Sequence, residues 1–547
     1  MRPALAAILL ALTPVVGLTA DTPVTGGGGQ NKLARKISAA IDHRLAADWA
    51  SRGIKAAPVA DDEEFCRRVY LDVIGRIPKV SEVRAFAADT DKDKRAKLVD
   101  TLMKKPGYST RLAETIRAAW LPETISDQFK TFLGENYEGY LRRKLAAGVS
   151  LDAIVKETLT TDVQVGQRGR IAFTQNADPD QQALQFFYQA LESKPENLGS
   201  MVTRALLGVK LECAQCHDHP FAPYSREQFW QFAAFFAEFT PLPPVGPNFV
   251  GPLEPQHTKN RLTIPGVVTK DGSAKQVSAR FMDGTTPAWK PEKSPRQELA
   301  DWIVSPKNPY FARNVVNRVW QQYFGVGLID PIDEPGDGNP PSHPELLDDL
   351  AAGFLDAEFD LRILIQGITG SLAYQLTSRL THPTQSDPRR FTRMNVKGLN
   401  GSQIFDSFVT ATGVRTDGNM AATRLDPGGT GVSKFSYRSL FPIPQKPIET
   451  QTSILQALTV MNGRLVADQT SVENGEVLGA IADAPFLTTE KKVEALFLAA
   501  LTRKPTDEEK EAFGSYVERG GPSGDKNKSL ADVFWVLLNS TEFLFNH

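Results

Sequence analysis

The sequence lacks the short motifs that mark the commonest hydrolases and nucleotide-binding enzymes. It contains no G-x-S-x-G, no H-E-x-x-H and no convincing Ser/His/Asp order, so a hydrolase interpretation has no nucleophile to name. Its Gly-rich piece, Gly428–Gly431, lacks the spacing of a P-loop or of a dinucleotide fingerprint. Enzymes of these classes are therefore not predicted.

The chain also lacks a strong net charge and, beyond its first residues, a long apolar run. Its 62 basic and 64 acidic residues give a formal charge of −2, so no overall positive field attracts nucleic acid. After the first 20 residues, no stretch reaches the roughly 18 apolar residues that a membrane-spanning helix needs. We expect a soluble protein with no transmembrane segment and no nucleic-acid partner.

The first residues have the features of an export signal. Arg2 precedes an apolar run from Ala4 to Leu18 that is too short to span a bilayer, and Leu18-Thr-Ala20 is typical of a cleavage site. Residues 1–20 are therefore predicted to be a signal peptide, cut near Ala20. A flexible Gly-rich spacer is expected over 21–31. These features predict a periplasmic or otherwise exported protein.

Cysteine and histidine are scarce, with three and seven copies, yet two of each fall within Cys213–His219. Cys213, Cys216 and His217 form C-x-x-C-H, the pattern by which a c-type haem is attached. Two thiols at this spacing reach the two vinyl groups of the porphyrin, and the next imidazole ligates the iron. Chance would place the motif in roughly 2 of 10,000 such chains. The third cysteine, Cys66, lies on the apolar face of an expected helix and is interpreted as a core thiol.

Two other interpretations of the motif remain open. In an exported protein, Cys213 and Cys216 could close a small disulfide. The two thiols, together with His217 and His219, are also of the residue types that bind zinc. Four ligands so close in sequence would, however, form a strained site. We favour one covalent haem c. For it we expect Cys213, Cys216, His217 and His219 to bind the cofactor, with His217 as the axial ligand of the iron.

A haem held by His217 has either a sixth ligand or an open face. His219 is too close in sequence to reach the other side of the ring, and we expect it to orient a propionate or a water molecule. The remaining internal candidates are methionines and histidines elsewhere in the chain: Met201, His257, Met282, His343 and His382. A ligand opposite His217 would favour electron transfer, and an open face would favour binding of a small oxidant.

Apolar residues at helical spacing, separated by capping residues, predict a mainly α protein. We expect two helical domains, at 32–240 and 294–547. Between them, proline and glycine crowd residues 241–293, which we interpret as a connector or small insert. Short β pieces are expected there at 262–269 and 276–282.

Serines mark expected helix starts around the motif and in the second domain. Ser200 is expected to begin a helix that delivers the chain to the motif. Ser225 with Gln228, and Ser342 with Glu345, have the spacing of capping boxes. The helix after Ser225 is rich in aromatic residues, which are expected either to pack on a porphyrin or to form plain core.

A second candidate site lies in the C-terminal half. Asn317 and Arg318 are expected on a helix, while Asp333, Glu334, Asp337 and His343 lie in or beside a Gly/Pro-rich loop. Polar groups on a loop beside an aromatic helix are typical of a pocket, which makes Asn317, Arg318, Asp337 and His343 the candidate pocket residues. The alternative is that Arg318 and the acids form a buried ion-pair network.

Long pieces of the chain resemble two domains that occur in pairs. The pieces DDEEFCRRVYLDVIGRIPKVSEVRAF and LLGVKLECAQCHDHPFAPYSREQFWQFAAFF are similar to the PSCyt-type cytochrome-like domain of unknown function that is expanded in planctomycetes. The pieces PRQELADWIVSPKNPYFARNVVNRVWQQYFGVG and LFLAALTRKPTDEEKEAF are similar to the PSD-type domain that usually follows it. Together the resemblance covers nearly all of the chain after the spacer.

The resemblance implies an exported haem protein in which Cys213 and Cys216 form thioethers and His217 is the axial ligand. We therefore expect electron transfer, or a haem-dependent redox component with a redox partner protein. One alternative is an envelope scaffold or interaction protein with a Cys213–Cys216 disulfide. Another is a metal-dependent enzyme linked to polysaccharide breakdown, for which an association with glycans rests on family analogy alone.

Overall fold

The computed structural model describes residues 32–121, 128–163, 178–239, 259–334, 336, 338–414, 434–444, 446–449, 466, 469–473 and 475–547. The expected signal peptide and spacer, residues 1–31, lie outside the described residues. So do Gly428–Gly431 and residues 240–258 of the Pro/Gly-rich segment.

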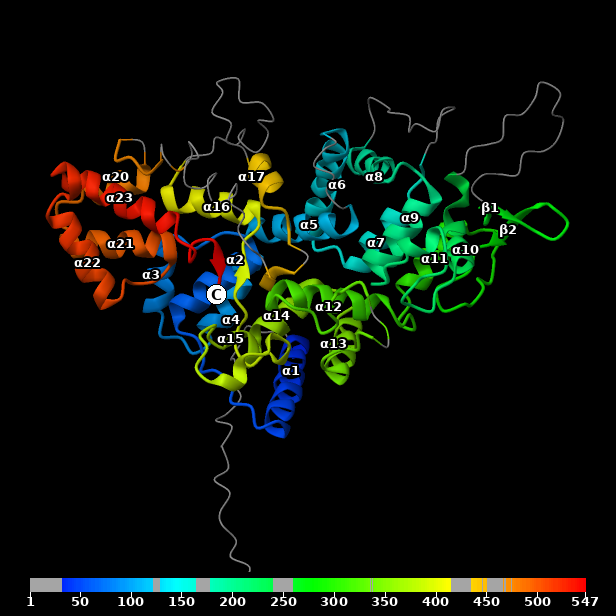
Figure 1. Ribbon diagram of the computed structural model, residues 1–547, viewed down its shortest axis with the longest axis horizontal. Coiled ribbons are helices and arrows are strands. Elements are labelled where there is room, and N and C mark those ends of the chain that lie inside the picture. The colour runs from blue at the N-terminus through cyan, green and yellow to red at the C-terminus, as the bar shows by residue number, and fades with distance from the viewer. Residues whose placement is uncertain are drawn as a thin grey trace, which may run out of the picture.

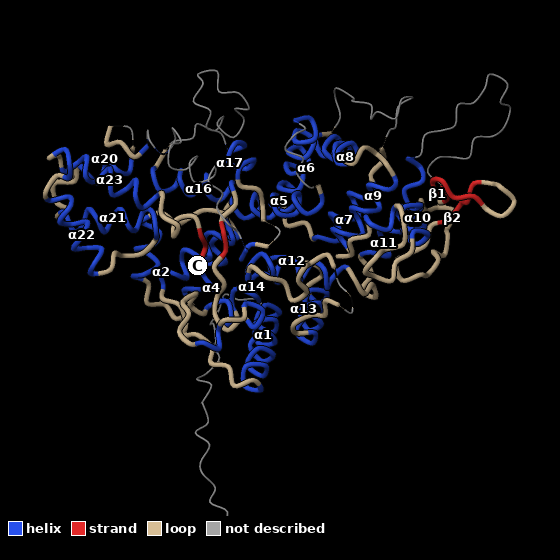
Figure 2. Tube along the Cα trace, in the orientation of Figure 1, coloured by secondary structure: helices blue, strands red, loops and turns tan. Residues whose placement is uncertain are grey.

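The described chain is mostly helical, which confirms the mainly α prediction (Figures 1 and 2). The helices before the Pro/Gly-rich segment are α1 (Lys32–Ser51), α2 (Asp62–Ile74), α3 (Val80–Ala88), α4 (Lys94–Met103), α5 (Pro106–Trp120), α6 (Gln128–Ala146), α7 (Leu151–Thr160), α8 (Pro179–Ala190), α9 (Pro195–Met201) and α10 (Arg226–Ala233). Those after it are α11 (Pro295–Ile303), α12 (Phe311–Phe324), α13 (Pro344–Asp356), α14 (Leu361–Gly370), α15 (Leu372–Gln375), α16 (Gly401–Thr412), α17 (Lys434–Leu440), α20 (Glu476–Ala482), α21 (Thr489–Leu501), α22 (Asp507–Glu518) and α23 (Lys526–Leu538). No helix among the described residues is both long enough and apolar enough to cross a bilayer.

Two small antiparallel strand pairs interrupt the helices. Strands β1 (Arg261–Val268) and β2 (Ala274–Ser278) form a hairpin in the Pro/Gly-rich segment, close to where the sequence predicts β pieces. Strands β3 (Lys397–Gly398) and β4 (Phe545–Asn546) pair across the second half of the chain. The hairpin lies at one end of the molecule and helices α20–α23 lie at the other (Figure 1).

Of the three helix starts predicted at serines, one is confirmed and two are wrong. The Ser225–Gln228 capping box is present at the start of α10. The one predicted at Ser342 is wrong, because α13 begins after His343, which provides no side-chain cap. Ser200 is also not a helix start, because it lies near the end of α9, which begins at Pro195. Cys66 is fully buried, as expected for a core thiol, and burial raises its pKa.

The buried apolar residues form two cores. The larger core contains residues from α1 through Met394, on both sides of the Pro/Gly-rich segment, and α1 packs directly on α13 and α14. The smaller core contains residues from Leu399 to Phe543 together with Leu71 and Ile77. The two cores therefore do not divide the chain at residues 241–293, and α2 contributes to both.

Helix α2 also buries charged side chains that bind distant parts of the chain. The guanidinium of Arg67 donates to the carbonyl oxygens of Ala500, Glu542, Phe543 and Phe545 at 3.1–3.3 Å. This is one buried cation that serves four backbone acceptors, which are otherwise costly to bury.

The neighbouring charges on α2 bind the segment after α15. Arg68 donates to the carbonyls of Tyr374 and Leu376 at 2.6 and 2.9 Å and pairs with Glu64 at 2.7 Å. One turn further along, Asp72 accepts from Lys397 at 2.7 Å. Charges out of water are tolerated when they are paired and hydrogen-bonded in this way.

The buried pair Asp72–Lys397 makes a first prediction. Lys397→Met leaves the carboxylate of Asp72 buried without its cation, so we expect the free energy of unfolding to fall by about 3 kcal/mol in urea titrations. The double variant that adds Asp72→Asn should recover part of this loss. The control is Lys36→Met, because the partner of Lys36, Asp356, is half exposed. Equal effects for Lys397→Met and Lys36→Met would contradict a role for the buried pair.

Asp42 makes a second prediction. It accepts a hydrogen bond from the Leu372 amide at 2.7 Å, and burial raises its pKa from 3.8 to about 6. The carboxyl group of Asp42 therefore binds a proton more tightly in the folded state than in the unfolded chain. Its contribution to the free energy of unfolding is complete below pH 3.8 and is lost as the pH rises through about 6.

Asp42→Asn keeps the oxygen that accepts from Leu372 and removes the buried charge. We expect the free energy of unfolding of the variant to be about 2 kcal/mol higher than that of the parent at neutral pH. We also expect the part of the pH dependence of stability that comes from Asp42 to disappear. Thermal or urea unfolding between pH 4 and 7 measures both effects. A variant less stable than the parent at pH 7 would contradict the assignment.

Candidate functional site

The Cys213–His217 motif follows an irregular helix end. After α9, a short π-helix, η1 (Val202–Leu206), carries the chain to Gly208, whose φ of +71° lies in the left-handed region. A side chain at this position would meet Oδ1 of Asn314 at 2.6 Å, so the close approach of α12 requires glycine. The chain then enters a 3-10 turn, η2 (Glu212–Gln215), which carries the first thiol.

The three motif side chains lie at the surface. Cys213, Cys216 and His217 are exposed, and both thiols are free. Between them, Ala214 is fully buried and belongs to the larger core. The motif is thus anchored by its small apolar residue, and its reactive groups face outward.

The N-terminal part of α10 holds the backbone of the motif. Nε of Arg226 and the indole N–H of Trp230 both donate to the carbonyl of Gln215, at 3.3 and 3.1 Å. The backbone N–H of Arg226 donates to Oδ1 of Asp218 at 2.8 Å. These bonds come from a capped helix whose aromatic side chains are buried in the core, so the aromatic residues of α10 are plain core. They fix the turn that contains both thiols.

The hydrogen bond of His217 fixes which ring nitrogen is free. Its Nδ1 lies 2.7 Å from the carbonyl oxygen of Asp218. A carbonyl oxygen only accepts, so Nδ1 carries the proton, and in the neutral ring Nε2 keeps its lone pair. Metal-binding histidines commonly have this arrangement. In His219, by contrast, Nδ1 accepts from the amide of Phe221 at 3.2 Å.

Zinc ligation and the candidate sixth ligands gain no support from the geometry. Within the part of the chain that the structure describes, no three His, Cys, Asp or Glu side chains converge as a metal-ligand group. Met201 and Met282 are buried in the larger core, and His382 starts a short 3-10 turn by accepting from Thr384 N at 3.3 Å. His257 lies outside the described residues.

Two residues of the second candidate site, Asn317 and His343, make separate structural contacts. Asn317 is buried and exchanges two hydrogen bonds with the backbone of Ile329, at 2.9 and 3.0 Å. His343 is buried beside Asp48 of α1, 3.4 Å from Nε2 to Oδ2, and burial lowers its pKa. Asp337 lies outside the described residues.

Arg318 forms an ion pair, as the alternative interpretation of this site predicts. It also contacts the segment that precedes the Cys213–His217 motif. Its guanidinium pairs with Asp333 and donates to the carbonyl of Arg204 at 2.7 Å. One turn earlier on α12, Asn314 donates to the carbonyl of Ala205 at 2.8 Å. The backbone N–H of Lys210 donates to the carbonyl of Asp333 at 2.9 Å. The second half of the chain therefore satisfies the carbonyl groups that the π-helix leaves unpaired.

Asn314 is not among the site residues predicted from the sequence, although the sequence contains a signal for it. Asn314 and Arg318 are four residues apart, so they share one face of a helix. Two polar side chains on the same helix face as buried apolar residues indicate that another segment of the chain supplies hydrogen-bond acceptors to them. The sequence does not identify that partner, because the π-helix has no sequence signature of its own.

This contact makes a third prediction. Arg318→Leu removes the donor to Arg204 and leaves Asp333 without its cation, so the segment before the motif should open more often. We expect the amides of Leu207 and Val209 to exchange about tenfold faster or more. Arg313→Leu on the same helix is the control, since its partner Asp348 is 60% exposed. Unchanged exchange in Arg318→Leu would contradict the role of this contact.

Comparison with known proteins places both halves of the chain. Residues 40–240 match the PSCyt2 family model, described as a protein of unknown function (DUF1549). Residues 295–430 match the PSD1 model, described likewise (DUF1553). Neither the curated proteins nor the solved structures contain a match. The chain is thus a PSCyt2 domain followed by a PSD1 domain, as the motifs in its sequence predict.

Proposed function

We propose that this protein is exported, carries one covalently attached c-type haem on Cys213–His217, and works in redox chemistry as an electron carrier or as a component of a haem-dependent oxidoreductase. The observation that carries the proposal is the C-x-x-C-H motif, whose two thiols and imidazole are all exposed while the alanine between the cysteines is buried.

The motif residues fit the attachment of a haem. Cys213 and Cys216 are free and accessible. At each of them, the sulfur and the hydrogen of the thiol would add to the two carbons of one vinyl group. A C–S bond forms, the vinyl double bond becomes single, and no group leaves, so the chemistry needs both thiols reduced.

His217 fits the role of axial ligand, because the bond from its Nδ1 to the Asp218 carbonyl leaves Nε2 with a lone pair. When bound, a haem supplies one-electron exchange between ferric and ferrous iron. The chain itself contributes the fixed backbone: Arg226 and Trp230 hold the carbonyl of Gln215 inside the motif. A rigid support of this kind limits the movement of the ligand when the charge at the site changes.

The surroundings of the motif suit a partner protein. Phe221, four residues after His217, is 95% exposed, and single exposed aromatic residues are common anchors at protein interfaces.

Export, supported by the sequence of residues 1–20, agrees with the haem, because c-type haem is attached outside the cytoplasm.

The test is to produce the full chain together with haem-maturation machinery. We expect a mass gain of about one haem and a Soret band, and expect both to be lost in the Cys213→Ser, Cys216→Ser double variant. His219→Gln is the control and should keep its covalent pigment. Pigment that survives in the double variant would refute the thioether assignment.

Two colourless outcomes would also reject the proposal. A loss of two hydrogens from the mass, without pigment, would indicate a Cys213–Cys216 disulfide and a scaffold or interaction protein. Bound zinc without pigment would indicate a metal-dependent role. Mass spectrometry, absorption and metal analysis on one preparation distinguish all three outcomes.

A further inference from the structure

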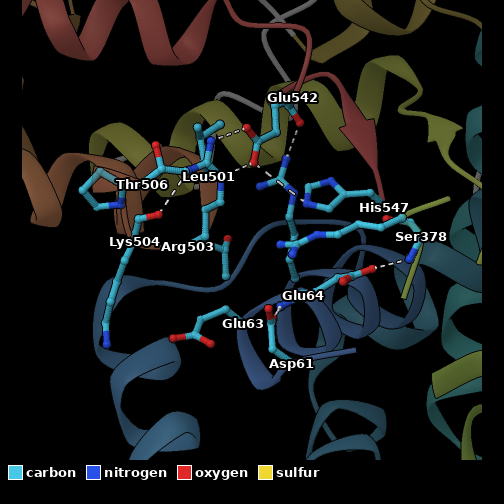
Figure 3. A pocket seen from close by; sticks show the side chains of 14 residues that line it. Asp61, Glu63, Glu64, Ser378, Leu501, Arg503, Lys504, Thr506, Glu542 and His547 are labelled. Carbon is cyan, nitrogen blue, oxygen red and sulfur yellow. Dashed lines mark hydrogen bonds and ion pairs between the residues drawn. The ribbon is translucent and has the colours of Figure 1, made fainter. Parts of the chain in front are cut away.

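A cleft of about 540 Å³ lies on the side of the molecule formed by α2 and the C-terminal helices (Figure 3). Its walls are the start of α2, residues 378–379 after α15, residues 501–506 between α21 and α22, and Glu542 and His547 near β4. Phe65 at the start of α2 belongs to the larger core and Leu501 to the smaller one, so the cleft lies along the junction of the two cores. Ligand sites occur preferentially at such junctions and at such volumes.

Two of the four acids that line the cleft, Glu64 and Glu542, are already engaged by cations. Glu64 pairs with Arg68 at 2.7 Å and accepts from the amide of Ser378 at 2.7 Å. Glu542 accepts from Arg503 at 2.6 Å, in an arrangement that Figure 3 shows beside His547. Their negative charge is therefore compensated within the protein.

Two cations of the cleft are not compensated in this way. Arg379 is exposed, and among the described residues no carboxylate lies within ion-pair distance of it. Arg67 is fully buried and donates to carbonyl oxygens, which carry only partial charge. Lys504 and Glu63 also line the cleft and carry opposite charges (Figure 3). Arg379 therefore keeps an exposed guanidinium with which a bound anion can pair.

Two donors beneath the cleft lack acceptors. Thr502 and Arg67 are both fully buried residues of its lining. The hydroxyl oxygen Oγ1 of Thr502 and the Nε of Arg67 have no hydrogen-bond partner among the described residues. Buried donors without acceptors are costly, so such groups commonly have a partner outside the chain.

His547 lies in the same cleft, with its Nε2 4.0 Å from Oε1 of Glu542. It is largely buried, and burial together with the charge of Arg67 lowers its pKa to about 4. Its imidazole is therefore neutral near pH 7, and an anion bound beside it would favour the protonated form.

We propose that this cleft binds the oxyanion group of a small molecule, a phosphate, sulfate or carboxylate, with Arg379 as the charged partner and the donors of Thr502 and Arg67 beneath it. Oxyanions present several acceptor atoms and full negative charge, which matches the unpaired guanidinium of Arg379 and the two donors without acceptors. The site shares no residue with Cys213–His217, so it is independent of haem attachment.

The experiment titrates the full-length protein with inorganic phosphate, sulfate and acetate by calorimetry, against chloride at equal ionic strength. We expect binding of at least one of the three oxyanions, and expect Arg379→Gln to weaken it by about tenfold, as for loss of one charge-assisted hydrogen bond. Arg261→Gln is the matched control, because Arg261 is an exposed arginine on the β1–β2 hairpin at the other end of the molecule. The three anions distinguish the source of the oxyanion.

A second readout does not depend on affinity. Sulfate keeps its charge over the range in which His547 titrates, so proton NMR should show the pKa of His547 rising when sulfate or another bound oxyanion is present. No binding of any oxyanion, equal affinity in Arg379→Gln, or an equal loss in Arg261→Gln would overturn the proposal. A pKa of His547 that is unchanged at saturating anion would do the same.

Discussion

The arrangement of the chain depends on the burial of charged side chains on α2. Arg67, Arg68 and Asp72 are almost completely shielded from water, and removing such charges from water costs several kcal/mol each. The cost is offset by their ion pairs and hydrogen bonds. Outside α2 itself, the partner closest in sequence is Tyr374, which lies 302 residues after Asp72. Helix α2 is therefore stable in its position only when the segments around Tyr374, Lys397 and the end of the chain are in place.

This constraint explains why the packing does not follow the composition of the sequence. Proline and glycine concentrate at 241–293, a segment that includes the hairpin, and that composition predicts a boundary between domains. The cores, however, are set by which faces bury apolar surface. Helix α1 packs on α13 and α14, and Leu71 of α2 belongs to the smaller core. The domain boundaries remain a prediction, whereas the two cores are connected through α2.

Features that depend on neighbouring residues could be predicted from the sequence, and features that depend on distant partners could not. The helical class, the hairpin and the cap at Ser225 follow from spacing within a few residues. The helix starts predicted at Ser342 and Ser200 are wrong for a different reason. A serine is only one of several neighbouring positions at which a helix can begin. At α13, Pro344 fixes the first turn, and at α9, Pro195 does so earlier in the chain. The π-helix could not be predicted, because its freed carbonyls are satisfied by α12.

The same distinction separates the two candidate sites. The C-x-x-C-H motif is contiguous, so its chemistry can be recognised before its structure is known, and the structure adds only the exposure of its groups and the orientation of His217. The cleft is assembled from four segments, none of which by itself has a motif that indicates a chemistry. Arg318 falls between these cases: its sequence suggests a pocket, yet its contacts lie with Asp333 and the backbone before the motif. A residue of the PSD1 domain thus supports the backbone that leads to the PSCyt2 motif, which gives a physical reason for the two domains to occur as a pair.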